Sequence, residues 1–449
     1  MTAEIAILNK TAVALAADSA VTISAGSNQQ KIFDSADKLF ELSVDQPIGV
    51  MINNDMNFME APLPVLIKDY RSRRCSFRRV EEAGLDFLKF LHEFGLEAPE
   101  QIKLENLRRA ITPILQTVHH RSQEAIFSRL FKEIEQGRKP DEVARDVYEE
   151  QINVMEAVLE RATPATLIGG KVIRPTNAER AVIDDVVAST LADASPDQRA
   201  HLSRMLRKYL DRIGVPALST GIVVAGFGSD ELFPTLIAFR LEGLLGGRLK
   251  YHREFFVDID RRGDKAKVIP FAQREMVERF LYGLDASIER QITQFCKTAV
   301  PKIREEILDR LDMPDADRAS LLEDAEAAEG VFFDALANDS FEAIRRQSRG
   351  AIEDMVEFMP KPEMAKMAEA LVNLTSIKRR VSRGMETVGG PIDVAVISKS
   401  EGFIWVRRKH YFSEELNQRF FDRMRAGSGR LGSERNGQSL QPGDNRARG

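Results

Sequence analysis

The sequence is poor in the residues that support several common chemistries. Among 449 residues there are two cysteines, one tryptophan and six histidines. So few cysteines exclude a multi-disulfide framework and a cysteine-based zinc site. The formal net charge is −5, so the chain has no basic excess that would attract a polyanion. We therefore expect no nucleic-acid partner.

Long apolar runs are also missing. No run reaches 18 residues, and the N-terminus lacks a basic region followed by an apolar stretch and a cleavage site. We expect no membrane partner and a cytoplasmic location. At the other end, residues 425–449 are rich in Gly, Ser, Asn and Arg and offer little to bury, which predicts a disordered tail.

Three motifs have residues that occur in metal, nucleotide or phosphate sites. His119 and His120 are adjacent in a helical pattern, where neighbouring side chains point about 100° apart and do not readily share one metal. The stretch "GFGSDELF" has two glycines but no Gly-Lys-Ser and no following helix. The basic cluster "RSRRCSFRR", Arg71 to Arg79, fits a solvated face better than a site for an acidic partner. We expect no metal and no cofactor.

Strand-like and helix-like stretches alternate in blocks along the chain. "EIAIL", "TAVALAA", "KLFELS" and "PIGVMI" are short apolar runs that predict strands, the first two forming a hairpin. Residues 57–214 and 273–383 repeat apolar residues at three- and four-residue spacing, which predicts helices. Strand candidates return in "TGIVVAGFG", "LFPTLIAFRL" and "AKVIPFA", and again in "PIDVAVISKSEGFIWV", which predicts a hairpin. Such segregation favours an α+β fold over a doubly wound parallel sheet.

The N-terminus suggests a nucleophile. Thr2 is small enough to permit removal of Met1, which would leave a hydroxyl and a free amine on one residue. A hydroxyl needs a nearby base to become nucleophilic. The free α-amine has an unperturbed pKa of roughly 7.7 to 8.0 and can take that role.

Several motifs together are similar to the proteasome β-subunit family of N-terminal nucleophile hydrolases. Thr2 precedes the strand-ending segment "LAADS", whose Asp18 follows it by sixteen residues as in that family. "DKLFELSVDQPIGVMINND" resembles the family's lysine followed by a glycine-containing strand, and "TVGGPIDVAVISKSEGFIWV" resembles its C-terminal Gly-Gly and hairpin. The resemblance implies an αββα sandwich spanning residues 2–424, with helical layers enlarged by the two helical blocks.

The resemblance also implies a set of site residues. Thr2 would be the nucleophile, with Asp18 and Lys38 as its catalytic partners; Lys31 competes with Lys38, but the spacing to Gly49 favours Lys38. Asn53 and Asn54 would supply oxyanion or substrate contacts. Thr387 would stand near the position of the family's serine in an Asp-x-x-Ser segment.

Two departures from the family pattern keep two functions open. Asn53 and Asn54 replace a glycine pair, and no Asp-x-x-Ser precedes Gly389. We predict a threonine-dependent peptidase or amidohydrolase that acts on a peptide or amide, and the alternative is a catalytically inert proteasome-like scaffold. In either case the helical layers are candidates for homo-oligomer contacts.

Overall fold

The architecture comes from a computed structural model of the chain. Two compact units divide it, Met1–Arg407 and Arg408–Gly449. The second unit contains a short helix, Glu415–Asn417. The structure describes residues 2–24, 30–214, 219–311, 313–381, 389–410, 412, 413, 415–419, 421 and 422. The predicted tail, 425–449, lies outside them.

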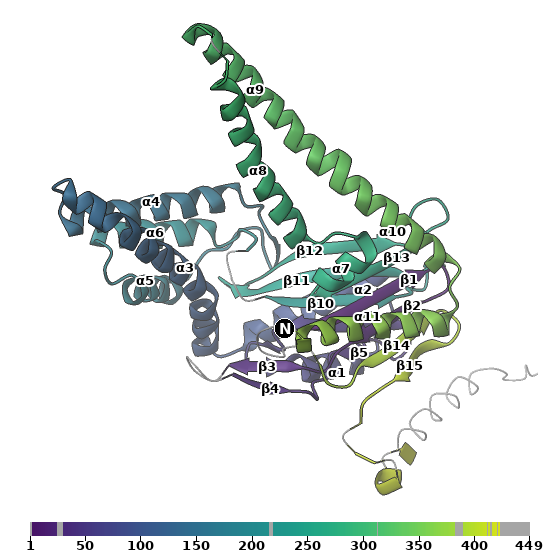
Figure 1. Cartoon of the computed structure of the whole chain (residues 1–449). Helices are drawn as coiled ribbons and strands as arrows, with labels where there is room; N and C mark the ends of the chain where they lie inside the picture. Colours follow the sequence, from purple (N-terminus) through teal and green to yellow (C-terminus); the bar gives the residue numbers. More distant parts are fainter. Residues whose placement is uncertain are drawn as a thin grey trace, which may run out of the picture. The chain divides into compact units, whose positions relative to one another are not determined.

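Two antiparallel sheets form the centre of the first unit (Figure 1). One has five strands, in the order β13 (Ala266–Ala272), β1 (Ala3–Asn9), β2 (Val13–Ala17), β14 (Asp393–Ser398), β15 (Gly402–Arg407). The other has six, in the order β5 (Leu39–Glu41), β6 (Ile48–Asn54), β10 (Thr220–Gly226), β11 (Thr235–Leu245), β12 (Arg248–Asp258), β9 (Thr166–Ile168). Two small ribbons add β3 (Val21–Ser24) with β4 (Gln30–Phe33), and β7 (Asn57–Phe58) with β8 (Ala61–Pro62).

The helices occupy two stretches of the chain. The first contains α1 (Leu63–Ser72), α2 (Val80–Glu97), α3 (Glu100–Glu135), α4 (Pro140–Arg161), α5 (Asn177–Thr190) and α6 (Pro196–Tyr209). The second contains α7 (Glu275–Tyr282), α8 (Ala286–Leu308), α9 (Asp315–Ala335), the π-helical turn η1 (Leu336–Phe341), α10 (Glu342–Glu357) and α11 (Lys361–Val381). No helix among the described residues combines the length and apolar character needed to cross a membrane.

The layers run helix, sheet, sheet, helix. Helices α10 and α11 cover the outer face of the five-stranded sheet, and α1 and α2 cover that of the six-stranded sheet. The sequence of β1 is almost continuously apolar because both faces of the strand are buried. Ile5 and Ile7 face the helices, whereas Ala6 and Leu8 face the other sheet. A strand that is buried on both faces needs apolar residues at nearly every position. The fold is therefore mixed α/β with antiparallel sheets.

Strand pairing joins the two ends of the first unit. β2 lies between β1 and β14, with Ala16 opposite Val394 and Leu15 opposite Ala395. The N-terminal hairpin and the hairpin in "PIDVAVISKSEGFIWV" therefore share one sheet. This pairing brings the start of β1, the end of β2 and the start of β14 to the same end of the five-stranded sheet.

Candidate functional site

Thr2 and Asp18 become neighbours because β1 and β2 are antiparallel. Thr2 immediately precedes β1, Asp18 immediately follows β2, and Glu4 pairs with Ala17. The Asp18 backbone N–H donates to the Ala3 carbonyl at 3.1 Å, so the hydrogen bonding between β1 and β2 continues one residue beyond the end of β2.

The Asp18 carboxylate is buried and accepts three hydrogen bonds. Its Oδ1 accepts from the Ala3 backbone N–H at 3.1 Å and from Lys38 Nζ at 2.6 Å. Its Oδ2 accepts from the Gly389 backbone N–H at 3.1 Å. Asp18 thereby fixes the start of β1, the segment before β14 and the lysine side chain together.

Lys38 stands directly before β5 and is one of the most buried side chains in the protein. Its Nζ lies 2.7 Å from Thr2 Oγ1, 2.6 Å from Asp18 Oδ1 and 2.6 Å from the Ala20 carbonyl oxygen. An ammonium group has three N–H donors and no acceptor, so these three oxygens satisfy it completely. The geometry thus presents a buried cation that donates to a threonine hydroxyl.

Thr2 is itself buried, with 4% of its surface exposed. Its carbonyl accepts a hydrogen bond from the Gln273 backbone N–H at 3.1 Å, next to β13. The hydroxyl accepts a hydrogen bond from Lys38 Nζ, so its own proton is available to a different acceptor.

Glu4 is a site neighbour that was not predicted. It is 1% exposed, and its Oε2 accepts from Asn53 Nδ2 at 3.1 Å, while Oε1 has no hydrogen-bond partner among the described residues. Burial raises the pKa of Glu4 to about 8, although the Lys38 charge and the Asn53 hydrogen bond act in the opposite direction. One feature of the sequence could have identified Glu4: it is an acidic residue in an apolar strand. It lies two positions after Thr2 and therefore on the same face of the strand.

The other predicted residues have different surroundings. The Asn53 side chain is buried against Gly221, where an added Cβ would lie 2.1 Å from Asn53 Oδ1. Asn54 ends β6, is exposed and has φ 66°. Thr387 lies outside the described residues. The backbone of Lys31 belongs to β4 rather than to the segment before β5.

Gly49 does not line the group formed by Thr2, Asp18 and Lys38. It lies at the opposite end of β6 from Asn53, and a Cβ added there would be 2.7 Å from Ile397 Cδ1 and 2.8 Å from Phe403 Cε2. Close packing between the two sheets explains the need for glycine at this position.

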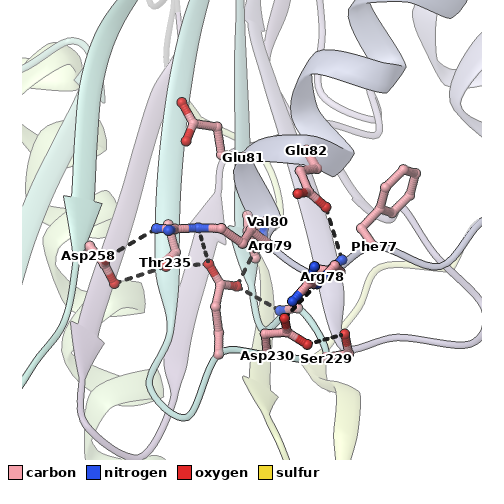
Figure 2. A network of polar contacts seen from close by, with 12 residues as sticks. Phe77, Arg78, Arg79, Val80, Glu81, Glu82, Ser229, Asp230, Thr235 and Asp258 are labelled. Carbon is pink, nitrogen blue, oxygen red and sulfur yellow. Dashed lines mark hydrogen bonds and ion pairs between the residues drawn. The ribbon is translucent and has the colours of Figure 1, made fainter.

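The basic cluster takes part in a polar network at the start of α2 (Figure 2). Arg78 pairs with Asp230 at 2.6 Å, and Arg79 pairs with Asp258 at 3.3 Å. Glu231 receives the Val80 backbone N–H at 3.1 Å, so it caps this helix. A pocket of about 510 Å³ is lined by these side chains, but their charges are already paired within the chain. We assign this network a structural role.

Metal-ligand chemistry has little support in the part of the chain that the structure describes. No group of three or more His, Cys, Asp or Glu side chains there is arranged to hold an ion. His119 Nδ1 lies 3.0 Å from the Tyr148 hydroxyl, and His120 lies beside Glu124.

Comparisons with known proteins add little. No protein-family model matches the sequence, and no curated protein matches it. A solved structure of the Anbu (Gly-1) mutant from Hyphomicrobium sp. strain MC1 aligns over 98% of this chain and 100% of that one, with 11% identity and a TM-score of 0.25. A TM-score this low carries no argument about fold or function.

Proposed function

We propose that this chain is a proteasome-like N-terminal nucleophile hydrolase, a threonine-dependent peptidase or amidohydrolase. The observation that carries the proposal is the position of Lys38 Nζ, 2.7 Å from Thr2 Oγ1 and 2.6 Å from Asp18 Oδ1. Two antiparallel sheets enclosed by helices, with Thr2 at the start of a central strand, support the same assignment.

The base in this proposal is the α-amine of Thr2. Lys38 cannot take the hydroxyl proton while its three N–H groups donate to three oxygens. Removal of Met1 would create an amine with an unperturbed pKa of roughly 7.7 to 8.0, able to accept the proton directly or through water. If Met1 is retained, that nitrogen is an amide and cannot act as the base.

The reaction would proceed through an ester. Thr2 Oγ1 adds to the carbonyl carbon of a peptide or amide, and its proton passes to the α-amine. The C–N bond then breaks, the leaving nitrogen takes the proton, and an acyl group remains on Oγ1 until water hydrolyses it. The Lys38 charge stabilises the developing negative charge on Oγ1, and Asp18 holds Lys38 in place.

The oxyanion donor is assigned to the end of β6. The Ile52 backbone N–H donates to the Lys38 carbonyl at 2.9 Å. Because N–H groups alternate between the two edges of a strand, the Asn54 amide falls on the same edge as that of Ile52. We therefore favour the Asn54 backbone over the buried Asn53 side chain, and Thr387 remains a proposed substrate contact.

An electrophilic probe tests the proposal. The mature protein should form a covalent adduct with an epoxyketone or β-lactone, and Thr2→Ala should abolish it. Thr2→Ala should also keep its circular dichroism spectrum, because alanine removes only the hydroxyl and one methyl group and retains the backbone hydrogen bond from Gln273. If mature protein that lacks Met1 fails to react with a panel of such probes, the inert scaffold is the better description. Equal labelling of Thr2→Ala would place the nucleophile elsewhere.

A further inference from the structure

Arg379, in the last turn of α11, is connected to the candidate site through Gln273. Its Nε donates to Gln273 Oε1 at 2.5 Å, and the Gln273 backbone N–H donates to the Thr2 carbonyl at 3.1 Å. A basic side chain in the last turn of a helix commonly does no more than offset the helix dipole. Arg379 is instead held by a residue that is itself hydrogen-bonded to the proposed nucleophile.

The backbone places Gln273 opposite Thr2. Ala3 pairs with Ala272 at the end of β13, so Thr2 and Gln273, the next residues along these antiparallel strands, also lie opposite each other. Ala272 has φ 60°, in the left-handed region that residues other than glycine seldom adopt. The chain therefore turns from β13 toward α7 at this point, while Gln273 stays beside Thr2.

The Arg379 guanidinium fixes the orientation of the Gln273 amide. A guanidinium has N–H donors and no acceptor, so the amide oxygen must face it and the amide Nε2 points elsewhere. This Nε2 is buried and has no hydrogen-bond partner among the described residues. Because buried N–H groups in proteins nearly always have an acceptor, the Gln273 amide indicates an oxygen atom that a ligand supplies.

Arg379 has no carboxylate partner in the part of the chain that the structure describes. The acidic side chains around it are paired with other cations: Glu254 contacts Arg274 at 3.6 Å. Glu275 contacts Lys378 at 3.5 Å. Arg379 is partly exposed, and no described residue accepts a hydrogen bond from either of its Nη atoms. A guanidinium that is held at Nε and keeps both Nη groups for a ligand suits the two oxygens of a carboxylate.

We propose that Arg379 and the Gln273 amide bind a carboxylate of the substrate beside Thr2. The two Nη groups donate to the carboxylate oxygens, and one of these oxygens also accepts from Gln273 Nε2. The inference rests on the proposed function. It narrows the substrate to a peptide or amide that carries an acidic group close to the bond that is cleaved.

Peptide binding to the Thr2→Ala chain tests the inference without any reaction. Three fluorescein-labelled alanine octapeptides carry Glu-Glu, Gln-Gln or Lys-Lys at their centre, and fluorescence anisotropy gives their dissociation constants. The Glu-Glu peptide should bind at least about 10-fold more tightly than the Gln-Gln peptide, as expected for hydrogen bonds to a charged group. The Lys-Lys peptide should bind most weakly.

Two further substitutions in the Thr2→Ala chain locate the preference. Arg379→Gln removes the charge and can still contact Gln273, so it should abolish the preference for the Glu-Glu peptide. Arg380→Gln is the matched control: it removes the same charge from the next residue of α11, which is exposed, and should keep the preference. Failure to bind the Glu-Glu peptide, equal binding of the Glu-Glu and Gln-Gln peptides, or a preference that persists in Arg379→Gln would overturn the inference.

Labelling of the mature chain by an electrophilic probe reports separately on the proposed function. Labelling at Thr2 without a preference for the Glu-Glu peptide would overturn the carboxylate site and leave the hydrolase proposal in place. A preference that depends on Arg379, in a chain that never labels, would support the carboxylate site and count against the hydrolase.

Discussion

Two lysines, Lys38 and Lys250, lie fully buried in this protein, and each pairs with a carboxylate. Lys38 contacts Asp18 at 2.6 Å, and Lys250 contacts Glu242 at 3.0 Å. Their remaining contacts differ: Lys38 donates to the Thr2 hydroxyl, whereas Lys250 donates to the backbone carbonyl of Arg212. A buried ion pair is therefore not by itself the mark of a reactive site.

The contacts of Lys250 indicate a purely structural role. It joins β12 to the segment after α6, and Glu242 on β11 also receives the Gly214 backbone N–H at 3.0 Å. Burial lowers the pKa of Lys250, because removing an ammonium from water disfavours its charged form. Lys38 differs from Lys250 because it donates to a side-chain hydroxyl, that of Thr2.

The largest expected effect separates the two lysines. Lys38→Ala should reduce labelling of Thr2 by an electrophilic probe at least about 100-fold, comparable to the loss of one transition-state donor. Lys31→Ala should leave labelling nearly unchanged. The rate of adduct formation, measured by intact mass spectrometry, checks both.

Lys250→Ala is the matched control for removing a buried cation. It should lower the free energy of unfolding by about 3–5 kcal/mol, because Glu242 is left buried without its partner. Labelling per folded molecule should stay at the wild-type level. A similar loss of labelling in both variants would mean that Lys38 also acts through the fold alone.

Asp18→Asn should have a smaller effect than Lys38→Ala. Asparagine keeps the shape but removes the charge that holds Lys38, and a hydrogen bond to a charged group is worth about 1.5–3 kcal/mol. Labelling should therefore fall by roughly 10- to 100-fold. Wild-type labelling in this variant would exclude Asp18 from the proposed chemistry.

Glu4→Gln should change the pH dependence of stability more than the chemistry. The folded-state pKa of about 8 lies above the ordinary value of 4.5, so the folded protein holds this proton more tightly than the unfolded chain does. The contribution of protonated Glu4 to the free energy of unfolding is fully present below about pH 4.5 and is lost as the pH rises through about 8. Glutamine cannot ionise, so the variant should gain Tm relative to wild type as the pH increases from 5 to 8. A constant Tm difference over this range would contradict the raised pKa.

Much of the sheet could be predicted from sequence. Strands buried on both faces, such as β1 and β10, have nearly continuous apolar residues that stand out between turns. β12 was missed, because its sequence contains Lys250, His252 and Arg253 and does not resemble a buried strand. Only the fold reveals that Glu242, at a register shift in the neighbouring strand β11, lies 3.0 Å from Lys250 and neutralises it.

Part of the candidate site was predicted through the resemblance to the proteasome β-subunit family, which named Thr2, Asp18 and Lys38. The antiparallel pairing of β1 with β2 explains why Thr2 and Asp18 are neighbours. The contact of Asp18 with the Gly389 amide joins positions 371 residues apart, and no local pattern specifies it. Glu4 was missed because an acidic residue near a chain end is ordinarily solvated, and its burial depends on packing between two sheets.

The mass of the native N-terminus tests the central claim most directly, because every proposed step requires a free amine on Thr2. Intact-mass measurement and N-terminal sequencing of the protein from its own cells should show a chain that begins at Thr2 with an unmodified amine. A chain that keeps Met1 throughout, or that is acetylated at its terminus, would contradict the proposed hydrolase mechanism.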